Sequence, residues 1–134
     1  ISAAMVLSDE VEIEHILPDN PKAELRATWA AENPNAVYDD YKNRLGNLTL
    51  LEKPINIVAG NDFYTAKQVE YGKSGNYLTR SLVALTDVGQ NTSISRINTK
   101  LAAFPAWNAA SIEKRHGLLI TLAQEVWKTT TIDV

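Results

Sequence analysis

A histidine next to an acidic residue, followed later by two asparagines, is the part of this sequence most able to do chemistry. The pair is Glu14 and His15, and the asparagines are Asn47 and Asn56. An imidazole can accept a proton, and carboxylate and amide oxygens can bind a hard metal ion. An asparagine can also hold a loop by hydrogen bonds to its backbone. Together these side chains could hydrolyse a phosphodiester with one metal ion, if the fold brings them together.

Each of these residues also has an ordinary structural interpretation. Glu14 continues a run of acids in a strand, and a histidine there is often a polar surface or core residue. Asn47 follows a glycine, as in many turns, and Asn56 could cap a helix. Consecutive strand residues point to opposite faces, so Glu14 and His15 reach one metal ion only if the strand bends. Pro18, just beyond them, is consistent with a bend.

The bulk composition fits one globular domain. The chain has 134 residues, is 45% hydrophobic and contains no cysteine. The missing cysteines exclude disulfides, thiolate zinc sites and cysteine nucleophiles. No run approaches the roughly 18–20 apolar residues of a membrane span, and we expect a cytoplasmic protein. Because the chain begins with Ile1, we interpret residues 1–134 as a single domain from a longer chain.

Charge is distributed unevenly along the chain. The net charge is −3, and residues 1–63 carry 5 basic and 11 acidic side chains. Residues 64–100 carry 5 basic and 2 acidic side chains. A locally basic segment could face phosphate, although ordinary solvated helix faces explain any single one of these residues as well.

The hydrophobic pattern predicts two short strands within a mainly helical domain. Alternation over 11–14 predicts the first strand, and the apolar run 48–51 predicts the second. Helices are predicted over 23–29, 36–43, 63–71, 77–85, 93–103, and from about 108 or 111 to 128. The last helix has an apolar stripe made of Ile112, Leu119, Leu122, Ala123 and Val126.

Strand, long loop, strand, helix is also the order of the ββα-metal finger, the core of HNH nucleases. A set of positions over 11–127 carries a specific resemblance: the segments 11–18 and 45–51, then Trp29, Asn56, Asn61, Phe63, Lys67, Trp107, Ile112, Arg115, Leu119 and Trp127. At these positions the chain resembles the HNH-like C-terminal nuclease domain of GmrSD-type restriction endonucleases, which are type IV and modification-dependent. That family domain was formerly a domain of unknown function.

The resemblance implies a fold that is mainly α with a small two-stranded antiparallel β element. A ββα core would cover about 10–74, and supporting helices would cover about 76–130. Such cores are too small to fold without a staple or added structure. Because this chain has no cysteine for a zinc site, the added C-terminal helices would supply that support.

The resemblance also implies a role for each candidate residue. His15 would be the general base, and Asn47 would bond the backbone of the loop after it. Glu14 and Asn56 would hold a divalent cation, Mg²⁺ first and Mn²⁺ second, because both offer hard oxygen ligands. The His15 ring, the Glu14 carboxylate and the Asn56 amide should then converge within roughly 4–7 Å.

Lys67 and Arg115 are the implied contacts to DNA phosphate. Lys67 could equally be a solvated lysine. Arg115 interrupts the apolar stripe of the last helix, so either a phosphate or a buried acid such as Glu12 could be its partner, and we favour the structural pairing. His116 is assigned no role. The tryptophans are expected to pack in the core rather than stack on bases: Trp29, Trp107 and Trp127.

The function implied by the resemblance is a metal-dependent DNA endonuclease domain in restriction or phage defence. Its partners would be DNA and an NTP-using recognition domain of the same system, which this fragment lacks. The main alternative is a catalytically degenerate HNH-fold module that binds DNA or a partner protein. A purely structural interaction domain is a further alternative, and it would show no salt-sensitive affinity for DNA.

Overall fold

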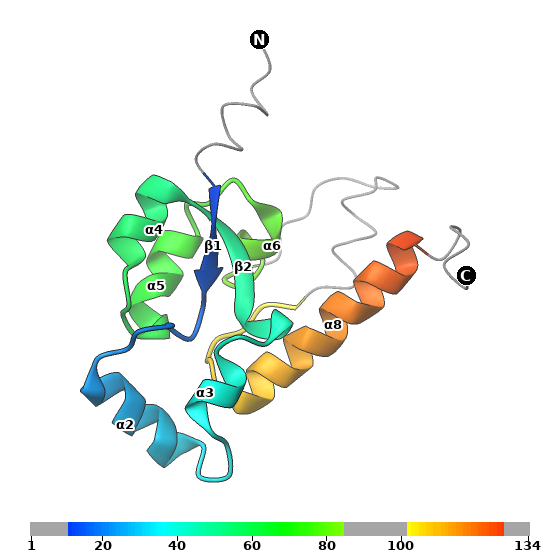
Figure 1. Cartoon of the computed structure of the whole chain (residues 1–134). Coiled ribbons are helices and arrows are strands. Elements are labelled where there is room, and N and C mark those ends of the chain that lie inside the picture. Colours follow the sequence, from blue (N-terminus) through cyan, green and yellow to red (C-terminus); the bar gives the residue numbers. More distant parts are fainter. Residues whose placement is uncertain (1–10, 85–101, 128–134) are drawn as a thin grey trace.

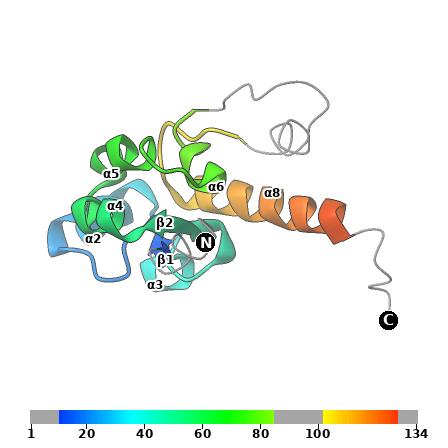
Figure 2. The same ribbon diagram turned by 90° about the horizontal axis from the view of Figure 1, so that it is seen from above.

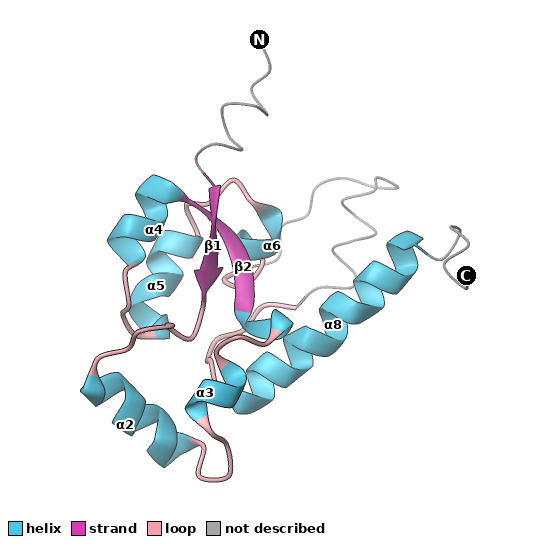
Figure 3. Ribbon diagram, viewed as in Figure 1, coloured by secondary structure: helices cyan, strands magenta, loops and turns pink. Residues whose placement is uncertain are grey.

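The computed structural model of the chain describes residues 11–84 and 102–127, and it is mainly helical with one two-stranded antiparallel sheet (Figures 1 and 3). Both the helical class and the antiparallel pair were expected. In chain order the elements are β1 (Val11–His15), α2 (Ala23–Glu32), α3 (Tyr38–Tyr41), the 3₁₀ helix η1 (Leu45–Asn47), β2 (Leu48–Glu52), α4 (Lys53–Ala59), α5 (Tyr64–Tyr71), α6 (Tyr77–Arg80) and α8 (Ala109–Trp127).

The sheet pairs β1 with β2, with Glu14 opposite Thr49 and His15 opposite Leu48. Successive side chains of a strand point to opposite faces, so Glu14 and His15 leave β1 on different sides. Glu14 is buried toward α5, whereas Ile13, on the side of His15, is 65% exposed. The strand therefore separates the two functional groups that the sequence places next to each other.

Two helices follow β2 where the sequence predicted one. Pro54 stands in the first turn of α4, where its missing N–H would have no partner in the helix. α4 ends at Gly60, whose φ of 57° leaves the helical range. Glycine suits this position because a side chain would strain a backbone with positive φ. Asn56 and Lys67 therefore lie on separate helices, α4 and α5.

The other helices differ from the predictions mainly in length. The predicted helix over 36–43 shortens to α3, and 77–85 shortens to α6. Residues 93–101 of another predicted helix lie outside the described residues, and 102–103 are not helical. None of the helices in the described part of the chain is long and apolar enough to cross a membrane. The cytoplasmic location stays a prediction.

The core collects residues from every part of the described chain. Trp29 and Trp107 are both buried, as expected. The expectation for Trp127 is wrong, because its side chain is 57% exposed at the end of α8. Figure 2 shows this end of α8 running away from α2, α4 and α5. The buried apolar residues are Ile16, Leu17, Leu25, Trp29, Tyr38, Leu51, Ala59, Tyr71, Leu82, Phe104, Trp107 and Ile112.

The apolar stripe of α8 is buried only near the start of the helix, because its far end extends away from the rest of the described chain. Ile112, near its start, is fully buried, whereas Leu119 and Leu122 are half-buried and Ala123 is exposed. The first turns of α8 pack against η1: Arg115 bonds to the carbonyl of Gly46, and the Ile112 carbonyl lies close to the same glycine.

Candidate active site

Asn47 fixes the loop that follows His15. Its side chain is fully buried, and its Oδ1 accepts hydrogen bonds from the backbone N–H of Leu17 at 2.7 Å and from Trp107 Nε1 at 2.9 Å. Its Nδ2 donates to the carbonyls of Leu17 at 3.0 Å and Lys42 at 2.7 Å. The predicted bonds from Asn47 to the backbone after His15 are thus present. The four bonds use the full hydrogen-bonding capacity of the amide: two hold the loop after His15, one holds Lys42 and one holds Trp107.

α8 packs against the turn that carries Asn47. A Cβ on Gly46 would lie 2.1 Å from the carbonyl oxygen of Ile112 and 2.7 Å from the backbone nitrogen of His116. Only glycine permits this approach. His116, which was assigned no role from the sequence, accepts a hydrogen bond on Nδ1 from the Gly46 N–H at 3.3 Å. Gly46 is therefore required by the packing of α8, a helix whose His116 lies 70 positions later in the chain.

Arg115 supports the same turn from α8. Its Nη1 donates to the carbonyls of Gly46 at 2.9 Å and Leu48 at 2.7 Å, on either side of Asn47. The preferred structural role is supported, but Glu12 as its partner is wrong, since Glu12 is exposed and bonds elsewhere. Burial lowers the pKa of Arg115 to about 10, so the guanidinium stays charged at neutral pH. This buried placement does not support a phosphate contact.

Glu14 belongs to a buried ion pair. Its Oε2 accepts hydrogen bonds from Lys67 Nζ at 2.9 Å and from the Tyr71 hydroxyl at 2.6 Å. The ammonium also donates to the carbonyls of His15 at 2.9 Å and Ile16 at 3.3 Å. Burial lowers the pKa of Lys67, an effect that Glu14 opposes, and burial together with Glu14 raises the pKa of Tyr71.

Lys67 has no donor left for a phosphate. A lysine ammonium has three hydrogens, and the three bonds described use all of them. The side chain is 1% exposed. Lys67 thus binds α5 to the end of β1, and its placement does not support the phosphate contact that the resemblance implies.

His15 is half-buried and bonds to a residue that the sequence did not suggest. Its Nε2 lies 3.0 Å from Oδ1 of Asn43, in the loop between α3 and η1. A carbonyl oxygen only accepts, so in this bond Nε2 carries the hydrogen, and in the neutral ring Nδ1 then keeps its lone pair. Asn43 had no signal of its own, because nothing local in the sequence ties it to a residue 28 positions away.

Asn56 and Glu14 make hydrogen bonds to different partners. Its Nδ2 donates to Oε1 of Glu12 at 2.9 Å, whereas Glu14 bonds to Lys67 and Tyr71. Within 11–84 and 102–127, no group of three or more His, Cys, Asp or Glu side chains could hold a metal ion. An ion beside Glu14 would also meet the Lys67 ammonium. The implied ligand pair does not fit a cation in this arrangement.

The geometry thus describes a small helical domain in which the loop after His15 is held by a buried asparagine, and the turn that carries this asparagine is held by α8. The family model of the C-terminal domain of GmrSD restriction endonucleases matches residues 3–122. The chain belongs to this family, which confirms the resemblance. Neither the curated proteins nor the solved structures contain a match to the chain.

Proposed function

We propose that this chain is a DNA endonuclease domain of the HNH type, acting in restriction, with His15 as the general base. The observation that carries the proposal is the buried Asn47 amide, which bonds both polar backbone groups of Leu17. Leu17 is two residues after His15, so the imidazole stands at the end of β1, directly before a loop that is held in place. Membership of a restriction endonuclease family makes DNA the expected substrate.

The chemistry assigned to His15 is proton removal from water. Nδ1 takes the proton while the water oxygen attacks phosphorus. The bond from phosphorus to the 3′-oxygen breaks, and the departing 3′-oxygen takes a proton from solvent water. The products are a 5′-phosphate and a 3′-hydroxyl end. Asn43 acts as a positioning residue, because its bond to Nε2 orients the ring and selects the tautomer. A correctly placed general base contributes about 10²–10⁴-fold to such a reaction.

Dependence on Mg²⁺ or Mn²⁺ is part of the proposal through the family alone. Because Glu14 and Asn56 have separate partners, no step of the mechanism is assigned to an ion. The NTP-using recognition domain and the cytoplasmic location are likewise proposed from the family, and neither involves a residue described here.

Plasmid cleavage tests the proposal. The wild-type chain should nick supercoiled DNA in Mg²⁺ or Mn²⁺ and not in EDTA. The His15→Ala protein should lose cleavage by at least about 10²-fold, keep its unfolding temperature and retain DNA affinity, since a neutral ring adds little to phosphate attraction. Wild-type cleavage by His15→Ala would end the proposal.

A second candidate function is a module that binds DNA without cutting it. The ion pair of Glu14 with Lys67 favours it, because a cation ligand would have to leave a buried partner. Salt-sensitive DNA binding, with no nicking in either metal, would select this function over cleavage.

A further inference from the structure

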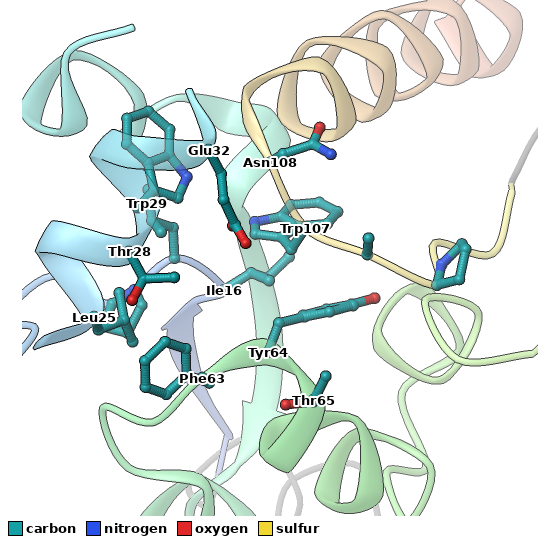
Figure 4. A pocket seen from close by; sticks show the side chains of 14 residues that line it. Ile16, Leu25, Thr28, Trp29, Glu32, Phe63, Tyr64, Thr65, Trp107 and Asn108 are labelled. Carbon is teal, nitrogen blue, oxygen red and sulfur yellow. The ribbon is translucent and has the colours of Figure 1, made fainter. Parts of the chain in front are cut away.

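A pocket of about 320 Å³ opens next to the loop that follows His15. Its walls come from α2, from residues 16–18, from the start of α5 and from residues 105–108 (Figure 4). Ile16, Leu17 and Pro18 follow His15 directly in the chain, and Leu17 is held by Asn47. The volume is at the small end for ligand sites, which suits a single ring system. The pocket therefore lies beside His15, the proposed general base, but His15 itself does not line it.

Flat aromatic side chains line much of this pocket. Trp29, Phe63, Tyr64 and Trp107 all contribute to it, from segments far apart in the sequence (Figure 4). The rings of Tyr64 and Trp107 stack on one another, with centroids 5.4 Å apart and an angle of 25° between the planes. Such walls favour a planar ligand that can stack.

The Trp29 indole places an unused hydrogen-bond donor in the pocket wall. Its Nε1 is buried and has no hydrogen-bond partner among the described residues, and the side chain is 4% exposed. Figure 4 shows the nitrogen on the edge of the ring that faces Glu32 and Trp107. The indole of Trp107, in contrast, is paired with Asn47. A buried donor without a partner is unfavourable, so a ligand with an acceptor would relieve it.

Glu32 supplies an acceptor beside that donor. It lies three residues after Trp29 on α2, so both side chains leave the same face of the helix. Figure 4 shows its carboxylate pointing into the pocket, between Trp29 and Trp107. A simple cation would leave the indole N–H unpaired, an anion would be repelled by Glu32, and a hydrocarbon would satisfy neither group. The pocket therefore favours a flat, uncharged ring that carries a hydrogen-bond donor next to an acceptor.

We propose that this pocket binds a nucleobase that carries an exocyclic amino group. The amino group donates to Glu32, and the neighbouring ring nitrogen or carbonyl accepts from Trp29 Nε1. As a subsite for a base extruded from the DNA strand near His15, the assignment rests on the proposed function. A free nucleotide offers the same base, and the experiment separates these two sources.

The first arm uses nucleosides and needs no catalysis. In ¹⁵N-labelled protein with EDTA, deoxycytidine or deoxyadenosine should shift the Trp29 indole resonance, and deoxyribose 5-phosphate should not. Glu32→Gln should weaken nucleoside binding about tenfold, since the charged acceptor becomes a neutral amide oxygen, which is a weaker one. Glu24→Gln is the matched control on an exposed position of α2 outside the pocket, and it should bind as the wild type does. An unmoved indole resonance, or unchanged affinity of Glu32→Gln, would overturn the assignment.

The second arm asks where the base comes from. An oligonucleotide duplex with one unpaired cytosine should bind about tenfold tighter than the same duplex with an abasic site, and should shift the Trp29 indole. A shift with the nucleoside alone would assign the pocket to free nucleotides. Failure of the two proposals can be told apart: base binding without nicking removes the nuclease, whereas nicking with an unmoved Trp29 resonance in both arms removes only the base site.

Discussion

Two buried polar clusters hold the end of β1, and they do so by different means. On the side of α8, Asn47 uses a neutral amide and depends on close packing at Gly46. On the side of α5, Lys67 and Glu14 use opposite charges and depend on charge balance. The first cluster holds the backbone after His15, and the second holds the carbonyls of His15 and the next residue. The end of β1 and the short loop after it are thus held by close packing on one side and by opposite charges on the other.

Breaking the shape cluster at Gly46 should have the largest effect. Gly46→Ala would place a Cβ within 2.1 Å of the Ile112 carbonyl oxygen, so α8 must move or the turn must unfold. We expect a loss of more than about 4 kcal/mol in the free energy of unfolding, measured by urea denaturation. The matched control is Gly72→Ala, where the nearest atom is 3.6 Å away and little change is expected. Equal stability of the two variants would show that the packing at Gly46 is not required.

Breaking the charge cluster should come next. Lys67→Met leaves the Glu14 carboxylate buried without its cation and removes the donor to two carbonyls. The expected loss is about 3–5 kcal/mol in the free energy of unfolding. Adding Glu14→Gln to Lys67→Met should recover a large part of it, because the charge is gone. If the double variant is as unstable as the single one, charge balance is not the basis of this cluster.

Removing the amide itself should follow closely. Asn47→Ala leaves the Leu17 N–H and carbonyl, and the Trp107 indole, without their partner. We expect a loss of about 3 kcal/mol in stability, and, at temperatures where the variant is folded, a drop in cleavage of about 10²-fold because the base is misplaced. Asn20→Ala, exposed in the same loop region, should change neither quantity. Full activity of folded Asn47→Ala would remove the link between the shape cluster and catalysis.

The smallest expected effect on stability lies at Asn43, outside both clusters. Asn43 is exposed, so Asn43→Ala should change the free energy of unfolding by less than about 0.5 kcal/mol. Cleavage should still fall about tenfold, because the His15 ring loses the bond that orients it. The pH dependence of cleavage should change as well, which a purely structural residue would not cause. An unaltered rate and pH profile would show that the two clusters alone position His15.

Local signals in the sequence were sufficient for the two strands, for the helix break at Gly60 and for the placement of Asn47 in a turn, whereas its bonds to the loop after His15 were predicted from the family resemblance. Each of these depends on a short stretch: alternation over a strand, a glycine in a left-handed conformation, or a motif next to a turn. The separation of Glu14 from His15 was also foreseeable, since neighbours on a strand face opposite ways.

Only the tertiary structure decided which buried polar groups pair with one another. Lys67 looked like a surface cation, Arg115 looked ready to pair with an acid, and Asn43 carried no signal at all. Their partners lie 28 to 69 positions away in the chain. A buried donor takes whichever acceptor the packing leaves unpaired, and that choice depends on all elements at once. Sequence determined the two strands, the longer helices and the motif, and packing decided the partner of each buried polar side chain.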